Sequence, residues 1–156
     1  FSIHKESVNI HLLIQKVVEL ILLQVENREG NIHLGLDASL PVIAADPIHI
    51  TNVIFNLVDN ANKYSPNNPS IYITSENNDR GIIVRVRDEG IGMTAETQKR
   101  IFEKFYRVST GNIHDIKGFG LGLSYVKAVV DQHGGQVLVE SEPDHGSTFE
   151  IFLPFK

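Results

Sequence analysis

The sequence predicts an α/β (α+β) two-layer sandwich, in which a mixed, mostly antiparallel sheet of about five strands is covered on one face by three helices. Three observations lead to this fold class. The chain has 156 residues, the size of one ordinary domain with a single core. Three segments place apolar residues at helical spacing, and several short segments alternate apolar and polar residues as half-buried strands do. We therefore expect residues 1–156 to form a single domain.

The first half of the chain predicts two of the helices. The first has apolar residues at roughly helical spacing and ends at Gly30; these residues are Leu13, Val17, Leu20, Ile21 and Leu23. The second begins at Asp46-Pro47, which have the residue types of an N-cap and a first helical turn. Helices are thus expected at 10–29 and 46–64, and strands at 31–36, 40–45 and, as a short edge strand, 6–8.

The second half predicts four strands, a short helix and the third main helix. The strands are expected at 71–75, 82–87, 136–141 and 147–153. A short helix begins at Thr94, and the third main helix covers about 121–133, before Gly134-Gly135. Residues 106–117 are polar and lack periodicity, so we expect a mobile loop there.

Composition excludes several functions. The net charge is −5 and the pI about 5.8, which argues against nucleic acid or an anionic membrane surface as the main partner. There is no cysteine, so disulfides and cysteine-ligated zinc are excluded. The longest apolar run, 17–25, is interrupted by Glu19 and Gln24 and is too short to span a bilayer. The chain lacks a start methionine and a signal-peptide pattern, so we expect it to be part of something longer.

The second helix carries an unusual polar stripe. Asn52, Asn56, Asn60 and Lys63 recur at i, i+4, i+8 and i+11 and so lie along one side of the helix. Asparagine is a poor helix former, and an exposed face more often uses Glu, Lys or Gln. Amide oxygens ligate Mg²⁺, and a lysine one turn on supplies a charge for phosphates. The spacing alone leaves this ligand role and a solvated face equally open.

Two glycine-rich segments complete the candidate site. Asp88-Glu89-Gly90-Ile91-Gly92 follows a strand, and its carboxylate could accept from the amino group of adenine, although Asp-x-Gly is also common in plain turns. Residues 118–123 precede the last helix, where backbone N–H groups form an anion site or where glycines only loosen the helix start. A dinucleotide-binding fingerprint must follow a strand, and no P-loop sequence exists, so both are excluded.

Five segments in order resemble the histidine-kinase ATPase family, part of the group that includes gyrase B, the Hsp90 chaperones and the MutL repair proteins. Residues 56–65 look like the N box, 88–93 the first glycine box, 101–107 the F box, 118–123 the second glycine box and 146–149 the terminal Gly-Thr-x-Phe element. The resemblance covers nearly the whole chain. It implies the Bergerat fold of that family, with residues 106–117 as the ATP lid and 1–8 as the junction to a dimerisation domain.

The resemblance also implies a role for each matching residue. Mg²⁺ is held by Asn60 with Asn56, phosphate and ribose by Lys63 and Tyr64, and the adenine amino group by Asp88, with Ile91 and Leu123 walling the pocket. Phosphates lie against Gly118, Gly120 and Gly122, and γ-phosphate charge is offset by Arg107 and by Lys117; Asn60, Lys63 and Arg107 are the catalytic candidates. The other nucleotide-binding residues of the matched boxes are Gly90, Gly92, Leu121, Ser147 and Thr148. Ser147 replaces a threonine and keeps a hydroxyl that could reach Asp88 through water, whereas Asn52 and His49 depart from the usual Gln and Arg.

The implied function is to bind Mg·ATP and donate its γ-phosphoryl group to a histidine on a separate dimerisation domain, from which a response regulator receiver domain takes it. Only His114 is followed by an acid, and it lies in the expected lid, so the acceptor is expected outside this chain. The resemblance implies a cytoplasmic domain, monomeric by itself, of a homodimeric protein anchored in the inner membrane. The alternatives are an anti-sigma-factor type serine kinase and an ATP-gated clamp of the gyrase B or Hsp90 kind; the F-box stretch favours the histidine kinase over both.

Overall fold

The computed structural model describes residues 1–104, 106 and 122–156. Within this part of the chain the main sheet has five strands in the order β2-β4-β5-β7-β6. Their bounds are β2 Asn31–Leu36, β4 Ser70–Asn77, β5 Gly81–Asp88, β6 Gln136–Ser141 and β7 Ser147–Pro154. β2 and β4 pair parallel and the other neighbours antiparallel, which confirms the expected mixed, mostly antiparallel sheet.

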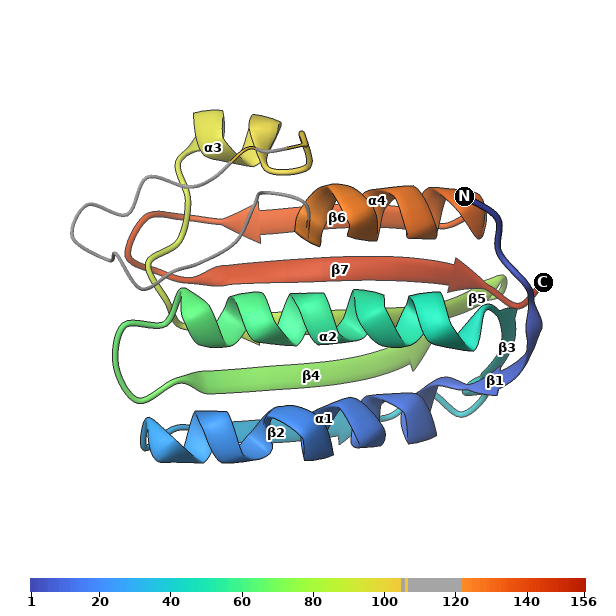
Figure 1. Ribbon diagram of the computed structural model, residues 1–156, viewed down its shortest axis with the longest axis horizontal. Coiled ribbons are helices and arrows are strands. Elements are labelled where there is room, and N and C mark those ends of the chain that lie inside the picture. Colours follow the sequence, from blue (N-terminus) through green and yellow to red (C-terminus); the bar gives the residue numbers. More distant parts are fainter. Residues whose placement is uncertain (105, 107–121) are drawn as a thin grey trace.

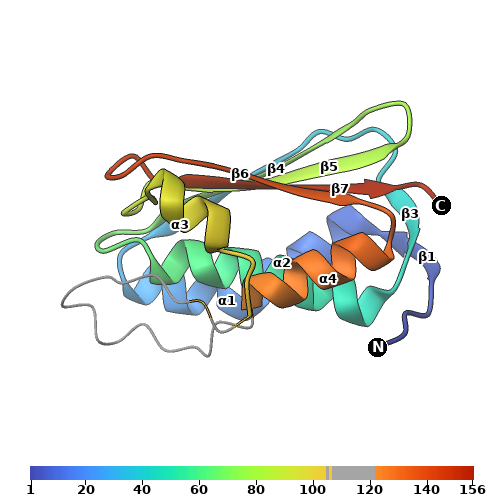
Figure 2. The same cartoon turned by 90° about the horizontal axis from the view of Figure 1, so that it is seen from above.

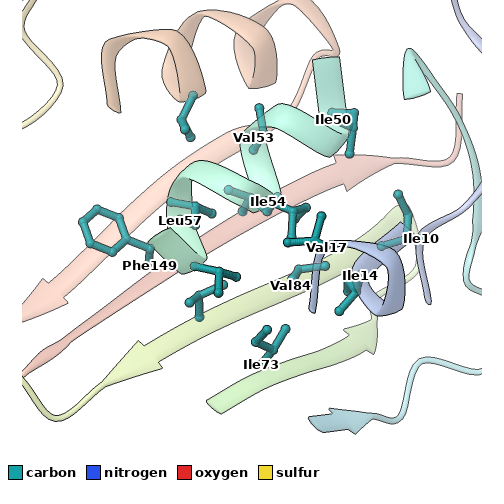
Figure 3. Packing of buried hydrophobic residues seen from close by; sticks show 14 of the residues in the cluster. Ile10, Ile14, Val17, Ile50, Val53, Ile54, Leu57, Ile73, Val84 and Phe149 are labelled. Atoms are coloured by element: carbon teal, nitrogen blue, oxygen red, sulfur yellow. The ribbon is translucent and has the colours of Figure 1, made fainter. Parts of the chain in front are cut away.

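Three helices cover one face of this sheet, as predicted (Figures 1 and 2). They are α1 Ile10–Asn27, α2 Pro47–Lys63 and α4 Gly122–Gln132, and the short α3 Ala95–Arg100 lies near one end of the sheet. Apolar side chains of α1 and α2 meet those of the sheet in a common core, shown for Ile14, Ile54 and Val84 among others in Figure 3. The two-layer α/β sandwich is therefore confirmed.

The predicted apolar pattern of the first helix is only partly buried. Val17 and Ile21 are fully buried, but Leu20 and Leu23 are 59% and 68% exposed. The helix also ends at Asn27, two residues before the expected position, because Glu29 takes the left-handed φ of 59° that closes the helix. Gly30 is needed for a different reason: a Cβ there would lie 2.4 Å from the Pro69 carbonyl oxygen.

The first predicted strand does form, but it does not join the main sheet. β1, Glu6–Asn9, pairs antiparallel with β3, Val42–Ala45, in a separate two-stranded sheet. This small sheet lies beside the C-terminus (Figure 1), where the Ala44 N–H donates to the Phe155 carbonyl.

Chain direction gathers the candidate residues at one end of the sandwich. α2 ends where β5 ends and β7 begins, on the left of Figure 1. Asp88, the last residue of β5, is directly opposite Ser147, the first of β7. The residues of these three sequence segments thus come together because the elements start or stop at the same edge.

Candidate nucleotide-binding site

A largely apolar pocket lies at this end of the molecule, between α2, the start of α4 and the sheet. Its lining residues are Asn60, Tyr64, Asp88, Ile91, Gly92, Met93, Ile101, Leu123, Ser147 and Phe149. Each of the five segments matched in the sequence contributes to this lining. Seven of the predicted site residues thus meet in one pocket, although 87 positions separate Asn60 from Ser147.

Asp88 is the buried charge of this pocket. Its side chain is only 6% exposed, and its Oδ1 accepts the N–H groups of Gly90 at 2.8 Å and Ser147 at 3.3 Å. Burial raises the pKa of the Asp88 carboxyl to about 6, against the lowering effect of these two hydrogen bonds and of nearby Arg87. Because both backbone donors go to Oδ1, in the part of the chain that the structure describes Oδ2 is the oxygen left to accept from a ligand.

The two glycines after Asp88 are required by close backbone packing. A Cβ at Gly90 would lie 2.2 Å from the Tyr64 carbonyl oxygen, and one at Gly92 would lie 1.8 Å from that of Glu142. Gly92 also has a φ of +68°. The Ile91 N–H donates to the Tyr64 carbonyl at 3.1 Å. The turn is therefore held against the end of α2, and Asp88 and Ile91 both line the pocket.

The polar stripe of α2 faces α4 over its first part and the pocket further along. Asn56 and Asn60 are half-buried, and the Asn56 side-chain oxygen is 3.7 Å from where a Cβ of Gly122 would stand. Nearer the start of α2, the Tyr125 hydroxyl bonds with His49 Nδ1 at 2.5 Å and with Asn52 Nδ2 at 3.4 Å. The stripe is therefore divided: its first part ties α2 to α4, and its second part reaches the pocket.

Five described residues of the predicted set lie outside the pocket lining: Asn56, Gly90 and Gly122, discussed above, and Lys63 and Thr148. Lys63 Nζ pairs with the Asp59 carboxylate at 2.8 Å, one turn back on α2. Thr148 alternates with Ser147 and Phe149 along β7, so its side chain points to the other face of the sheet, opposite Arg87. The remaining predicted residues, Arg107, Lys117, Gly118, Gly120 and Leu121, lie outside the described residues, as do 107–117 of the expected lid.

A hydroxyl network behind Asp88 was missed by sequence reasoning. Ser141 Oγ accepts the Met93 N–H at 2.8 Å, donates to the Gly146 carbonyl at 2.9 Å and lies 2.7 Å from Ser147 Oγ. Gln98 Nε2 donates to the carbonyls of Met93 at 3.1 Å and Ser141 at 2.8 Å. The only signal in the sequence was a serine on each side of a turn that pairs β6 with β7.

The residues present fit Mg·ATP. One buried carboxylate in an apolar slot suits a flat base with an exocyclic amino group. The amide oxygens of Asn56 and Asn60 on α2 are of the type that could ligate Mg²⁺ together with phosphate oxygens and water. Among the described residues, no three histidine or acidic side chains form a metal site. No helix in the described ranges is long and apolar enough to cross a membrane.

Known proteins resemble this chain over nearly its whole length. Sensor protein RprX of Bacteroides fragilis is 47% identical over 144 residues, which make up 91% of this chain and 28% of RprX. The adaptive-response sensory kinase SasA of Synechocystis sp. is 34% identical over 155 residues, which make up 99% of this chain and 40% of SasA. The chain thus spans less than half the length of these relatives.

Solved structures of histidine kinases are similar to this chain in fold. The nucleotide-free catalytic domain of histidine kinase ThkA superposes with a TM-score of 0.86 at 28% identity, covering 98% of this chain and 97% of that one. Full-length ShkA in complex with AMPPNP has a TM-score of 0.86 at 28% identity, covering 99% and 32%. ThkA in complex with the response regulator TrrA has a TM-score of 0.81 at 26% identity, covering 97% and 42%.

The sequence itself matches a family model over residues 45–156, from the end of β3 onward. The match includes every residue that lines the pocket. The chain therefore belongs to the histidine kinase-, DNA gyrase B- and HSP90-like ATPase family, and within it is a catalytic domain of the sensor histidine kinase type.

Proposed function

We propose that this domain binds Mg·ATP and donates the γ-phosphoryl group to a histidine on a dimerisation domain of the same, longer protein. The observation that carries the proposal is the buried Asp88 carboxylate in an apolar pocket built from all five family segments. Burying this charge costs the folded state free energy, and a titratable group so perturbed within a pocket is a candidate for binding a ligand. The AMPPNP complex of the similar kinase ShkA supports an adenine nucleotide as that ligand.

The chain's own residues would divide the work by position. Asp88 accepts from the adenine amino group, and the apolar walls at Ile91 and Leu123 exclude water from the base. Asn60, the residue of the α2 polar stripe that lines the pocket, offers an amide oxygen to Mg²⁺, and Asn56 lies one turn earlier on the helix. Lys63 stands one turn from the pocket, where its charge can reach phosphate if it leaves or shares Asp59. Phosphoryl transfer depends mostly on such positioning and on charge stabilisation.

The partners follow from the same proposal. The first is the dimerisation domain that presents the acceptor histidine, with residues 1–8 as the junction to it. The second is a response regulator receiver domain, a class of partner with which ThkA has been crystallised. We place the domain in the cytoplasm, monomeric by itself, within a homodimeric kinase anchored in the inner membrane, because the similar proteins are sensor kinases.

The test is phosphoryl transfer from labelled ATP. By itself the domain should bind Mg·ATP, measured by calorimetry, but should barely label itself. Joining it to the two-helix dimerisation domain of its parent protein should give labelling that is acid-labile and base-stable, as a phosphohistidine is. Joined halves should outperform mixed halves because tethering raises the effective concentration. Strong labelling of the isolated domain, or acid-stable phosphoserine on an added protein, would contradict the proposal; the second result would instead indicate a serine kinase.

A further inference from the structure

Arg28 lies outside the pocket and outside residues 45–156 matched by the family model, yet it holds one wall of the pocket in place. It follows α1 directly and is half-buried. Its Nη1 donates to the Asn62 backbone carbonyl and, at 3.0 Å, to the Asn62 side-chain oxygen. Its Nη2 donates to the Ser65 carbonyl and, at 3.4 Å, to that of Pro66. One guanidinium thus serves four oxygens at the end of α2.

These oxygens favour a positively charged donor because they lie at the C-terminal end of α2. The last carbonyls of a helix have no donor four residues further along the helix, although the Asn62 carbonyl also accepts the Ser65 N–H at 3.4 Å, and a cation is favourable at that end of the helix dipole. Asn62 and Ser65 are 5% and 2% exposed, so water cannot easily replace the guanidinium. The Ser65 hydroxyl donates to a fourth carbonyl, that of Ala61, at 2.7 Å.

Tyr64 lies in the sequence between Asn62 and Ser65, whose carbonyls Arg28 binds. Its own carbonyl accepts the Ile91 N–H at 3.1 Å, and Gly90 packs directly against it. Tyr64 and Ile91 both line the pocket. A continuous chain of contacts therefore leads from the end of α1, through the end of α2, to the turn that follows Asp88.

We propose that Arg28 is a positioning residue for nucleotide binding. By donating hydrogen bonds to the carbonyls of Asn62 and Ser65, on both sides of Tyr64, it sets the position of the Tyr64–Ile91 contact and hence the width of the pocket. The proposal rests on the proposed function, in that the ligand is an adenine nucleotide. A lysine would serve only part of this role, because a compact ammonium cannot reach carbonyls on both sides in the way a planar, forked guanidinium does.

The experiment compares Arg28→Gln and Arg28→Lys with Arg80→Gln. Arg80 is a matched control, an arginine just before β5 that does not line the pocket and whose guanidinium lies 5.5 Å from the centre of the Phe152 ring. ATP affinity is measured by calorimetry, and amide hydrogen exchange is measured by NMR for Ile91 and for Val84 in the centre of the sheet. We expect Arg28→Gln to weaken ATP by about tenfold, the scale of one lost charge-assisted hydrogen bond. Ile91 exchange should accelerate while Val84 exchange stays unchanged, Arg28→Lys should lie in between, and Arg80→Gln should match wild type.

The outcomes separate this inference from the proposed function. If wild type binds ATP and Arg28→Gln binds it equally well, Arg28 does not position the pocket. If Ile91 and Val84 exchange accelerate by the same factor, Arg28 acts only through global stability, and the proposal is wrong. If wild type itself does not bind ATP, the proposed function fails, and this inference fails with it. Should Arg28→Gln not fold, the same comparison of the two amides in Arg28→Lys decides the question.

Discussion

Replacing Asp88 with asparagine should make the protein more stable and a poorer ATP binder. The pKa of the Asp88 carboxyl is raised from 3.8 to about 6, chiefly by burial. At 1.36 kcal/mol per pKa unit, keeping this group ionised at pH 7 costs the folded state roughly 3 kcal/mol. Asparagine removes the charge but keeps an oxygen for the N–H groups of Gly90 and Ser147. Asp88→Asn should therefore raise the free energy of unfolding by up to about 3 kcal/mol at pH 7.

The gain in the free energy of unfolding expected for Asp88→Asn should depend on pH in a specific way. A carboxyl whose pKa is raised in the folded state contributes stability below its ordinary pKa and loses it as pH rises through the folded value. The difference between Asp88→Asn and wild type should thus be full above pH 6 and should shrink as pH falls from 6 towards 3.8. Urea denaturation between pH 5 and 8 measures it. Glu89→Gln is the matched control, because Glu89 is adjacent, carries the same charge and is 57% exposed; it should change stability little at any pH.

The cost of this substitution should appear in ligand binding. An amide nitrogen at the position of Oδ2 would oppose the adenine amino group and leave a polar group unpaired in a dry pocket, so affinity should fall by about 1–3 kcal/mol. Adenosine is the better probe across this pH range, since it has no phosphate to titrate. If Asp88→Asn is no more stable than Glu89→Gln at pH 7, or binds adenosine as wild type does, our account of Asp88 is wrong.

Three further substitutions test separate parts of the structure. Asn60→Ala should weaken Mg·ATP while leaving metal-free adenosine near wild type, as measured by calorimetry with and without Mg²⁺; equal losses for both would mean that Asn60 is structural. Gly92→Ala should cost at least about 2 kcal/mol more in urea denaturation than Gly122→Ala, because only Gly92 combines a positive φ with a backbone oxygen 1.8 Å from the added Cβ. His133→Leu should destabilise by about 1–3 kcal/mol, since the buried ring accepts the Asp46 N–H at 3.0 Å, and a stability equal to wild type would contradict that role.

Much of the fold and of the site could be predicted because the signals are local. The apolar spacing of α2 fixed both its buried face and the side on which Asn56 and Asn60 lie. Asp88 was recognisable as a carboxylate at a strand end followed by glycines. Strand alternation placed Ser147 and Phe149 on one face of β7, although the resemblance that selected Thr148 did not take this alternation into account.

Contacts between distant polar residues could not be predicted. Arg28 serves carbonyls at Asn62 and Ser65, and His133 meets a backbone N–H 87 residues away, at Asp46. A lone arginine or histidine has no periodicity, so nothing in the sequence names its partner. The reason for Gly90 was hidden in the same way, because the atom that excludes a side chain there belongs to Tyr64 on another element.

The sequence by itself thus determined the element order, the buried faces and the residue types of the pocket, since each depends on spacing within one segment. Only the tertiary structure decided which contacts support the pocket. These are the carbonyls to which Arg28 donates, the hydroxyls of Ser141 and Ser147 that hydrogen-bond to each other near Asp88, and the bond of the first part of the α2 polar stripe to Tyr125. These contacts depend on where separate elements end relative to one another, and that relation is set by the packing of the whole core.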